Sequence, residues 1–221
     1  MDVIRKLFEA SVEHHRAGRH MDARAGYREI LKIMPEYADA LHMLGVLAYQ
    51  AGRQDESVSL LRSALQRLPE NSGVYINLGN ALQASDRLGE AIDAFRSAIR
   101  LNPDSAVAYN NLGNALRQQG KADEALVALK QSMALGSDYA DAYVNLAMTY
   151  QALGDNENAI IAYGRAVELD GRHEAARHML AALRGDTTGK APRVHVERLF
   201  DEYAARFDSH LVKTLGYSMP G

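Results

Sequence analysis

Asparagine side chains recur at a fixed spacing in the middle of the chain. Asn77, Asn111 and Asn145 follow one another at intervals of 34 residues, and Asn80 and Asn114 form a second column three residues further on. Asparagine is a poor helix former, so helix propensity does not explain these columns. Because a side-chain amide carries two donors and an acceptor group, one such amide per period could bind the backbone of an extended peptide without reading its sequence.

Histidines are the second group of side chains with a chemical use. His14, His15 and His20 cluster near the start of the chain. Adjacent residues on a helix do not face one another, so we expect a solvated helix end there and no metal site. His42 and His178 stand alone in helical segments, where they could line a groove, and we assign no catalytic role to either.

Enzyme motifs are absent from the sequence. It contains no dinucleotide-binding, phosphate-loop, nucleophile-elbow or zinc-protease pattern. The stretch GDTTGK at 185–190 lacks the preceding strand and the spacing of a phosphate loop, which favours a linker. We therefore predict no catalytic residue, no cofactor and no bound metal in this chain.

The asparagines lie within an internal repeat. Residues 74–103, 108–137 and 142–171 align at an interval of 34 residues, and earlier copies extend the period towards the N-terminus. The clearest columns are held by tyrosine, leucine, glycine, alanine or proline. Among their members are Tyr75, Tyr109 and Tyr143; Leu78, Leu112 and Leu146; Gly79 and Gly113; Ala91, Ala125 and Ala159; and Pro35, Pro69 and Pro103.

Each copy reads as two amphipathic helices, because its apolar residues recur at spacings of three and four. Gly18, Gly52, Gly120 and Gly154 stand between the two helices, where a turn needs positive φ. Gly79 instead lies within a helix, where glycine costs about 1 kcal/mol relative to alanine. Close approach of the paired helix would explain that recurrent cost.

These columns resemble the tetratricopeptide repeat family. The resemblance covers residues 4–171 as five copies, with approximate bounds 4–37, 38–71, 72–105, 106–139 and 140–173. Departures are Ser11 and Ser57 in the early copies, and Ser137 and Gly171 in place of the closing proline. The resemblance implies an all-α fold, a right-handed superhelical solenoid of antiparallel helix pairs with C-terminal capping helices. Residues 173–184 read as a capping helix and 185–192 as a linker.

In the resembled family the asparagine columns line the concave groove, and a similar ladder occurs in O-linked N-acetylglucosamine transferases. The alternative is that these positions were copied with the repeat and are merely solvated. Family members that grip a terminal carboxylate place basic residues at defined groove positions. Those positions hold Ile76 and Val107, or Asn110 and Asp141, here. This sequence therefore disfavours a carboxylate clamp.

The segment 193–221 departs from the 34-residue period. Its apolar residues recur at helical spacing, namely Val196, Leu199, Phe200, Tyr203, Phe207 and Leu211. This extra amphipathic helix could dock on the capping helix around Met179, Leu180 and Leu183, enter the chain's own groove or pack on a neighbouring molecule, and we expect the first. The stretch LFDEYAARFDSHLVKTLGYSMP resembles the junction between repeats and catalytic domain in bacterial repeat-containing S-adenosylmethionine-dependent methyltransferases. That resemblance implies a truncated downstream domain, and no catalytic residue carries over from it.

Composition sets the remaining limits. The net charge is −3 with no cysteine in 221 residues, which points to neither nucleic acid nor an anionic membrane. No secretory signal or spanning segment is evident, and a cytoplasmic location is expected. The function predicted is a scaffold that binds a protein or peptide in its groove, as a monomer or weak homodimer. The alternatives are the substrate-docking arm of a methyltransferase and a homo-oligomeric assembly scaffold.

Overall fold

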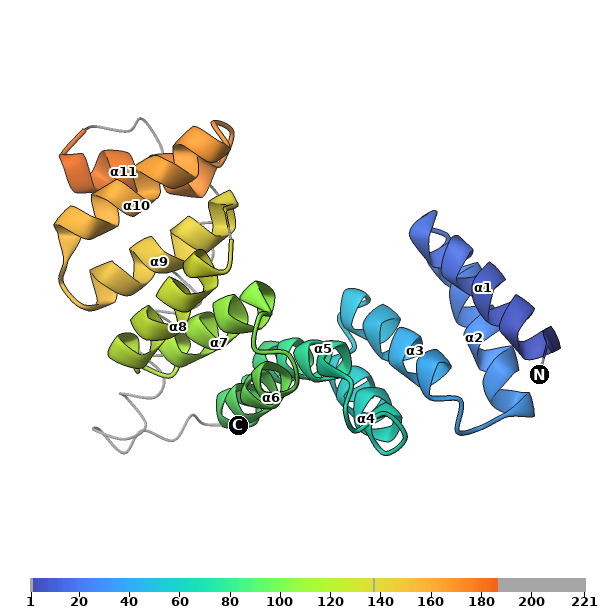
Figure 1. Cartoon of the computed structure of the whole chain (residues 1–221). Helices are drawn as coiled ribbons and strands as arrows, with labels where there is room; N and C mark the ends of the chain where they lie inside the picture. The colour runs from blue at the N-terminus through green and yellow to red at the C-terminus, as the bar shows by residue number, and fades with distance from the viewer. Residues whose placement is uncertain (1, 137, 187–221) are drawn as a thin grey trace, which may run out of the picture. The chain divides into compact units, whose positions relative to one another are not determined.

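The computed structural model describes residues 2–136 and 138–186, and within them the chain is helical without a strand, as the sequence predicted. The chain divides into two compact units at Asp138 and Tyr139. The helices of the first unit (Figure 1) are α1 Asp2–Arg16, α2 His20–Ile33, α3 Ala38–Gln50, α4 Gln54–Leu65, α5 Ser72–Ala84, α6 Leu88–Leu101, α7 Ala106–Gln118 and α8 Ala122–Ala134. Those of the second unit are α9 Ala140–Ala152, α10 Asn156–Leu169 and α11 Glu174–Arg184.

Tight turns join the two helices of each pair, as Figure 1 shows for α1–α2 and α3–α4. Gly18, Gly52 and Gly120 adopt φ values of 72°, 70° and 84° in these turns, and Gly154 adopts 77° in the second unit. This confirms the reason predicted for glycine there. The α5–α6 turn has Asp86 at φ 57° instead, a conformation that L-residues other than asparagine and aspartate rarely adopt.

In each pair the helix that comes first in the chain (α1, α3, α5, α7 or α9) is called the first helix, and its partner the second helix. Glycines inside first helices let the second helix approach closely. A Cβ atom added to Gly79 would lie 2.4 Å from the ring of Phe95, and one added to Gly113 would lie 2.6 Å from Leu129. Both facing side chains are fully buried. The predicted close approach is therefore confirmed, because a larger residue at either position would require the facing side chain or its helix to shift.

The first helix pair solves the same packing problem with different residues. Ser11 occupies the position of the glycine, and Gly26 stands opposite it on α2, where an added Cβ would lie 2.1 Å from the Ser11 Oγ. The Ser11 hydroxyl donates to the Leu7 carbonyl at 2.7 Å. In the second helix pair, Ser57 of α4 replaces the expected alanine, and its hydroxyl donates to the Gly45 carbonyl of α3 at 2.8 Å. Both serines are buried and hydrogen-bonded, as buried hydroxyls must be.

Apolar side chains from neighbouring pairs form the cores. In the first unit one cluster joins α4 to α8 around Phe95 and Leu82, and another joins α1 to α3 around Tyr27 and Ile30. In the second unit α9, α10 and α11 pack around Tyr163. Each buried large side chain contributes roughly 1.5–3 kcal/mol, so helices that are marginal alone become stable when stacked.

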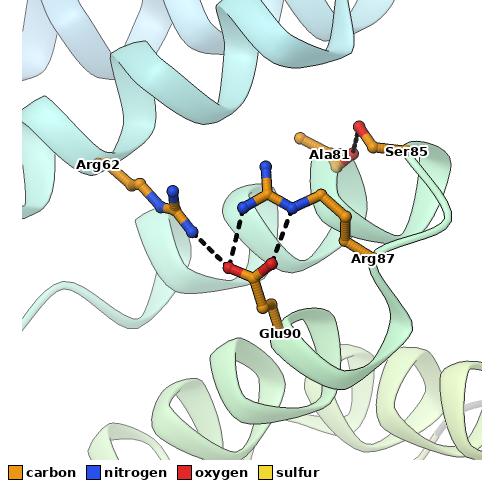
Figure 2. A network of polar contacts seen from close by, with 5 residues as sticks. All are labelled: Arg62, Ala81, Ser85, Arg87 and Glu90. Carbon is orange, nitrogen blue, oxygen red and sulfur yellow. Dashed lines mark hydrogen bonds and ion pairs between the residues drawn. The ribbon is translucent and has the colours of Figure 1, made fainter.

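Ion pairs on the second helices connect neighbouring pairs of the first unit (Figure 2). Glu90 accepts from Arg87 at the start of α6 at 2.8 and 2.9 Å, and from Arg62 of α4 at 2.5 Å. The hydrogen bond from Arg87 lowers the pKa of Glu90. Arg96 and Glu124 repeat the contact between α6 and α8 at 3.3 Å. These contacts link α4 to α6 and α6 to α8 on the exposed surface.

The C-terminal end of the described chain is α11, which packs on α10 in the second unit. His173 caps it by accepting from the Ala176 N–H at 3.2 Å, and its Nε2 contacts Asp141 of α9 at 3.0 Å. Gly185 ends the helix with φ 79°. The amphipathic helix predicted for 193–221 and most of the linker predicted for 185–192 lie outside the described residues.

Candidate functional site

Four of the predicted asparagines lie on neighbouring first helices of the first unit. Asn77 and Asn80 belong to α5, Asn111 and Asn114 belong to α7, and all four side chains are half-buried. The tight turns and the glycine contacts hold α5 against α6 and α7 against α8. Because α6 packs on α7 and α5 also contacts α7 directly, α5 and α7 are neighbouring first helices. The spacing of three residues places both asparagines of each helix on one face.

Asn77 is linked to the preceding first helix. Its Nδ2 lies 2.8 Å from the Nε2 atom of His42 on α3. An amide nitrogen can only donate, so Nε2 must be the accepting nitrogen of a neutral imidazole, with the proton on Nδ1. Burial lowers the pKa of His42, partly offset by the Asp39 charge. The low pKa keeps the ring in the form that accepts from Asn77 near neutral pH.

Asn80 and Asn111 link the next two first helices. The Asn111 Nδ2 donates to the Asn80 Oδ1 at 2.9 Å, and the Asn110 Nδ2 approaches the Asn111 Oδ1 at 3.4 Å. One turn further along α7, Arg117 donates to the Asn114 Oδ1 at 3.0 Å. The asparagines are therefore bonded to the protein rather than only solvated.

The pairing leaves a definite set of polar atoms for a ligand. Asn80 and Asn114 each use Oδ1 as an acceptor, and no described residue accepts from either Nδ2 group. Each of these amides retains two N–H donors. Asn77 uses its Nδ2 and retains its Oδ1. These four asparagines, Asn77, Asn80, Asn111 and Asn114, are called the asparagine row below. The row offers mainly hydrogen-bond donors, which suit the carbonyl oxygens of a peptide backbone.

Two further polar pairs follow the same pattern between first helices. The His15 Nε2 lies 3.2 Å from the Gln50 Oε1, and the Gln83 Nε2 donates to the Gln118 Oε1 at 2.9 Å. Sequence reasoning missed these pairs and the His42–Asn77 contact. The signal was present, because each pair joins residues 35 apart, one more than the repeat period.

Asn145, the fifth predicted residue, is half-buried on α9 in the second unit. Its backbone carbonyl accepts from the Thr149 hydroxyl at 2.8 Å. The structure brings Asn77, Asn80, Asn111 and Asn114 together in the first unit. The role of all five asparagines in a peptide-binding ladder stays a prediction.

The positions of a carboxylate clamp hold no lysine or arginine in the structure either. Ile76 is half-buried, Asn110 is buried and Asp141 pairs with His173. Among the early histidines, the His14 Nδ1 accepts from Arg19 at 2.8 Å, and the His15 and His20 rings lie 5.6 Å apart. Within residues 2–136 and 138–186 no group of three histidine or acidic side chains is arranged to hold a metal ion.

Comparison with known families agrees with this architecture. Residues 72–138 and 104–172 match one sequence profile of the tetratricopeptide repeat family, and residues 10–72 match a second profile of that family. Together these matches span most of the chain. The chain therefore belongs to the tetratricopeptide repeat family.

Solved structures share the fold. A thermophilic TPR protein of Thermus thermophilus aligns with a TM-score of 0.66 and 24% identity, over 81% of this chain and 98% of that one. PilF of Pseudomonas aeruginosa aligns with a TM-score of 0.73 and 20% sequence identity, over 98% of this chain and 94% of PilF. YrrB is described as a TPR protein with an unusual peptide-binding site. It aligns with a TM-score of 0.65 and 23% sequence identity, over 78% of this chain and 89% of YrrB. No curated protein matches the chain in sequence.

The family matches end at residue 172, so the methyltransferase resemblance of the last segment stays a prediction, as does an assembly role. None of the helices in the described part of the chain has the length and apolar character needed to cross a membrane.

Proposed function

We propose that this chain is a protein-interaction scaffold that binds an extended peptide along the first helices of its first unit. The groove residues are Asn77, Asn80, Asn111 and Asn114, with Asn145 as a predicted continuation. The observation that carries the proposal is the arrangement of Asn80 and Asn114. Each amide is held by a bond to its Oδ1 and presents both N–H groups without a described acceptor.

Pre-organised donors favour binding because little side-chain freedom is lost when the ligand arrives. The Asn80 side chain is fixed by Asn111, and that of Asn114 is fixed by Arg117. A peptide in extended conformation presents carbonyl oxygens at regular intervals along its length. Two half-buried amides on successive helices can each donate to one such carbonyl. YrrB, which shares the fold, is itself described as having a peptide-binding site.

An isosteric substitution tests the proposal without removing the internal bonds. In Asn80→Asp with Asn114→Asp, one carboxylate oxygen still accepts from Asn111 or Arg117, but the two N–H groups become a second acceptor. Peptides would first be selected from a random library on the parent protein and then titrated by fluorescence anisotropy. We expect binding to weaken roughly 10- to 100-fold, because each lost hydrogen bond contributes about 0.5–1.5 kcal/mol.

The matched control is Asn102→Asp with Asn156→Asp. Both side chains are exposed at the ends of second helices, α6 and α10, and neither lies on the first helices that carry the four asparagines. The pair adds the same charge but removes no donor from α5 or α7, so it should leave affinity within about twofold, because exposed charges are screened by salt. Equal weakening in both pairs would show that charge, not the amide donors, governs binding. Unchanged affinity in the groove pair would reject the proposal.

A further inference from the structure

A pocket between the first two helix pairs lies apart from the asparagine row. Its volume is about 300 Å³, and it is formed where the start of α2 meets the end of α3 and the turn that follows. Its lining residues are His20, Met21, Arg24, Leu47, Gln50, Ala51 and Arg53. This volume lies at the lower end of the range for small ligand sites.

The lining of this pocket combines apolar and cationic groups. Leu47 is buried, and Met21 and Ala51 add further apolar surface, while Arg24 and Arg53 supply guanidinium groups. None of the seven lining residues is acidic. The corresponding pocket one repeat later is lined by Asp55 and Glu56 as well as Arg53. This second pocket is larger, about 530 Å³, and unlike the first it is lined by carboxylates.

Arg24 is the cation most available to a ligand. Arg53 is paired with Glu56 at 2.8 Å. The Arg24 Nη2 instead donates to the Met21 Sδ at 3.5 Å, a weak and uncharged acceptor, and no carboxylate in the described chain pairs with Arg24. A guanidinium is a planar fork of donors that matches the two oxygens of a carboxylate.

Polar groups beside the pocket are also incompletely satisfied. His15 contacts two lining residues, through its ring with His20 and through Nε2 with Gln50. Its Nδ1 and the hydroxyl of Tyr27 are buried without a partner in the described chain. In the second unit, the tyrosine at the position of Tyr27 donates to a glutamine at the position of His15, namely Tyr163 to Gln151 at 2.7 Å. A ligand or water entering here would gain polar partners that the protein leaves unused.

We propose that this pocket binds the C-terminal residue of a peptide, with an apolar side chain against Leu47, Met21 and Ala51 and the terminal carboxylate on Arg24. A C-terminal residue carries its carboxylate and its side chain on the same carbon atom, which fits cationic and apolar lining within one small pocket. The pocket is lined by residues at the start of α2, at the end of α3 and in the turn after α3, and by none of the asparagines. Its proposed function can therefore be tested independently of the asparagine row.

The test uses small probes that isolate each group. The methyl resonance of Met21 would be followed by NMR during titration with N-acetyl-leucine, N-acetyl-leucinamide, acetate and N-acetyl-aspartyl-leucinamide. We expect N-acetyl-leucine to give a saturable shift, and the other three probes to bind at least tenfold more weakly. Equal binding of the amide would overturn the role of the carboxylate, and equal binding of acetate would overturn that of the side chain. Equal binding of the aspartyl probe would overturn the preference for a chain terminus.

Variants place the contact on Arg24. Arg24→Gln should abolish the saturable shift, and Arg24→Lys should retain part of it because the charge remains. Arg28→Gln, exposed on the same helix and outside the pocket lining, should bind like the parent. The methyl resonance of Met133 serves as the folding control. Full binding by Arg24→Gln, or absence of any saturable shift in the parent protein, would refute the proposal.

Discussion

The contact between Ser11 and Gly26 makes a quantitative prediction about how the first helix pair packs. In the other pairs of the first unit the first helix supplies the glycine, whereas here the glycine facing Ser11 is on α2. Gly26→Ala should gain about 1 kcal/mol in helix propensity. Its Cβ would however lie 2.1 Å from the Ser11 Oγ and 3.1 Å from the Ser11 Cβ, and such overpacking costs about 1–3 kcal/mol.

The hydroxyl of Ser11 adds to that cost. It is fully buried and donates to Leu7, so displacing it gives up about 0.5–1.5 kcal/mol. We therefore expect Gly26→Ala to destabilise the protein by about 1–2 kcal/mol. Ser11→Gly should cost a similar amount, because it removes the same hydrogen bond and leaves two glycines facing each other. The double variant Ser11→Gly with Gly26→Ala should have an unfolding free energy within about 0.5 kcal/mol of the parent's, because a glycine again faces a residue with a Cβ atom.

Urea unfolding followed by circular dichroism would measure the cycle, with hydrogen exchange of the α1 and α2 amides as a local readout, because end repeats can open before the whole unfolds. The expected coupling free energy is about 2–3 kcal/mol, in favour of the double variant. If the two single costs simply add in the double variant, the packing explanation is wrong.

Other substitutions test other parts of the account. Gly79→Ala should lower the melting temperature, because the added Cβ would collide with Phe95. Gly164→Ala, inside α10 with no neighbour within 4 Å, should raise the unfolding free energy by about 0.5–1 kcal/mol. If both variants stabilised the protein, the packing argument would be wrong. Asp86→Gly should stabilise by about 0.5–1 kcal/mol in thermal unfolding because φ is 57° there, and a loss would show that the aspartate side chain has a role beyond the turn. Burial places the folded-state pKa of His42 below its unfolded value of about 6.5, so the folded protein binds fewer protons between the two pKa values. The contribution of His42 to the unfolding free energy is therefore fully present above pH 6.5 and is lost as the pH falls from there through the lower folded-state pKa. His42→Gln should therefore reduce the difference in unfolding free energy between pH 7.5 and 5.5, and an unchanged difference would contradict the assignment.

The repeat and its helices were accessible from sequence because each depends on local and periodic rules. Glycine with positive φ marked the turns, and the cost of Gly79 pointed to a closely packed partner helix before the structure placed Phe95 there. The exchange of roles between Ser11 and Gly26 was not predicted, because it requires knowing which residue of α2 faces Ser11. The departure at Asp86 likewise carries no compositional signal, since aspartate is common in turns and on surfaces.

The chemistry of the asparagine row was only partly predictable. Its spacing indicated a shared face, but not that His42 would occupy the acceptor position beside Asn77 or that Asn80 would pair with Asn111. Those contacts depend on how far each first helix is displaced from the next, a tertiary quantity. The unbroken 34-residue period likewise gives no sign of the division between Asp138 and Tyr139, although the closing proline of that copy is replaced by Ser137.

Side-chain amide resonances measure the central claim most directly. The protein, labelled with nitrogen-15, would be titrated with a peptide selected on the parent, while the NH₂ signals of Asn80, Asn114, Asn102 and Asn156 are followed. If the two groove amides donate to the peptide backbone, their signals shift saturably and with one dissociation constant, while those of Asn102 and Asn156 stay in place. A peptide that saturates the protein and leaves the Asn80 and Asn114 amides unchanged would contradict the proposed function.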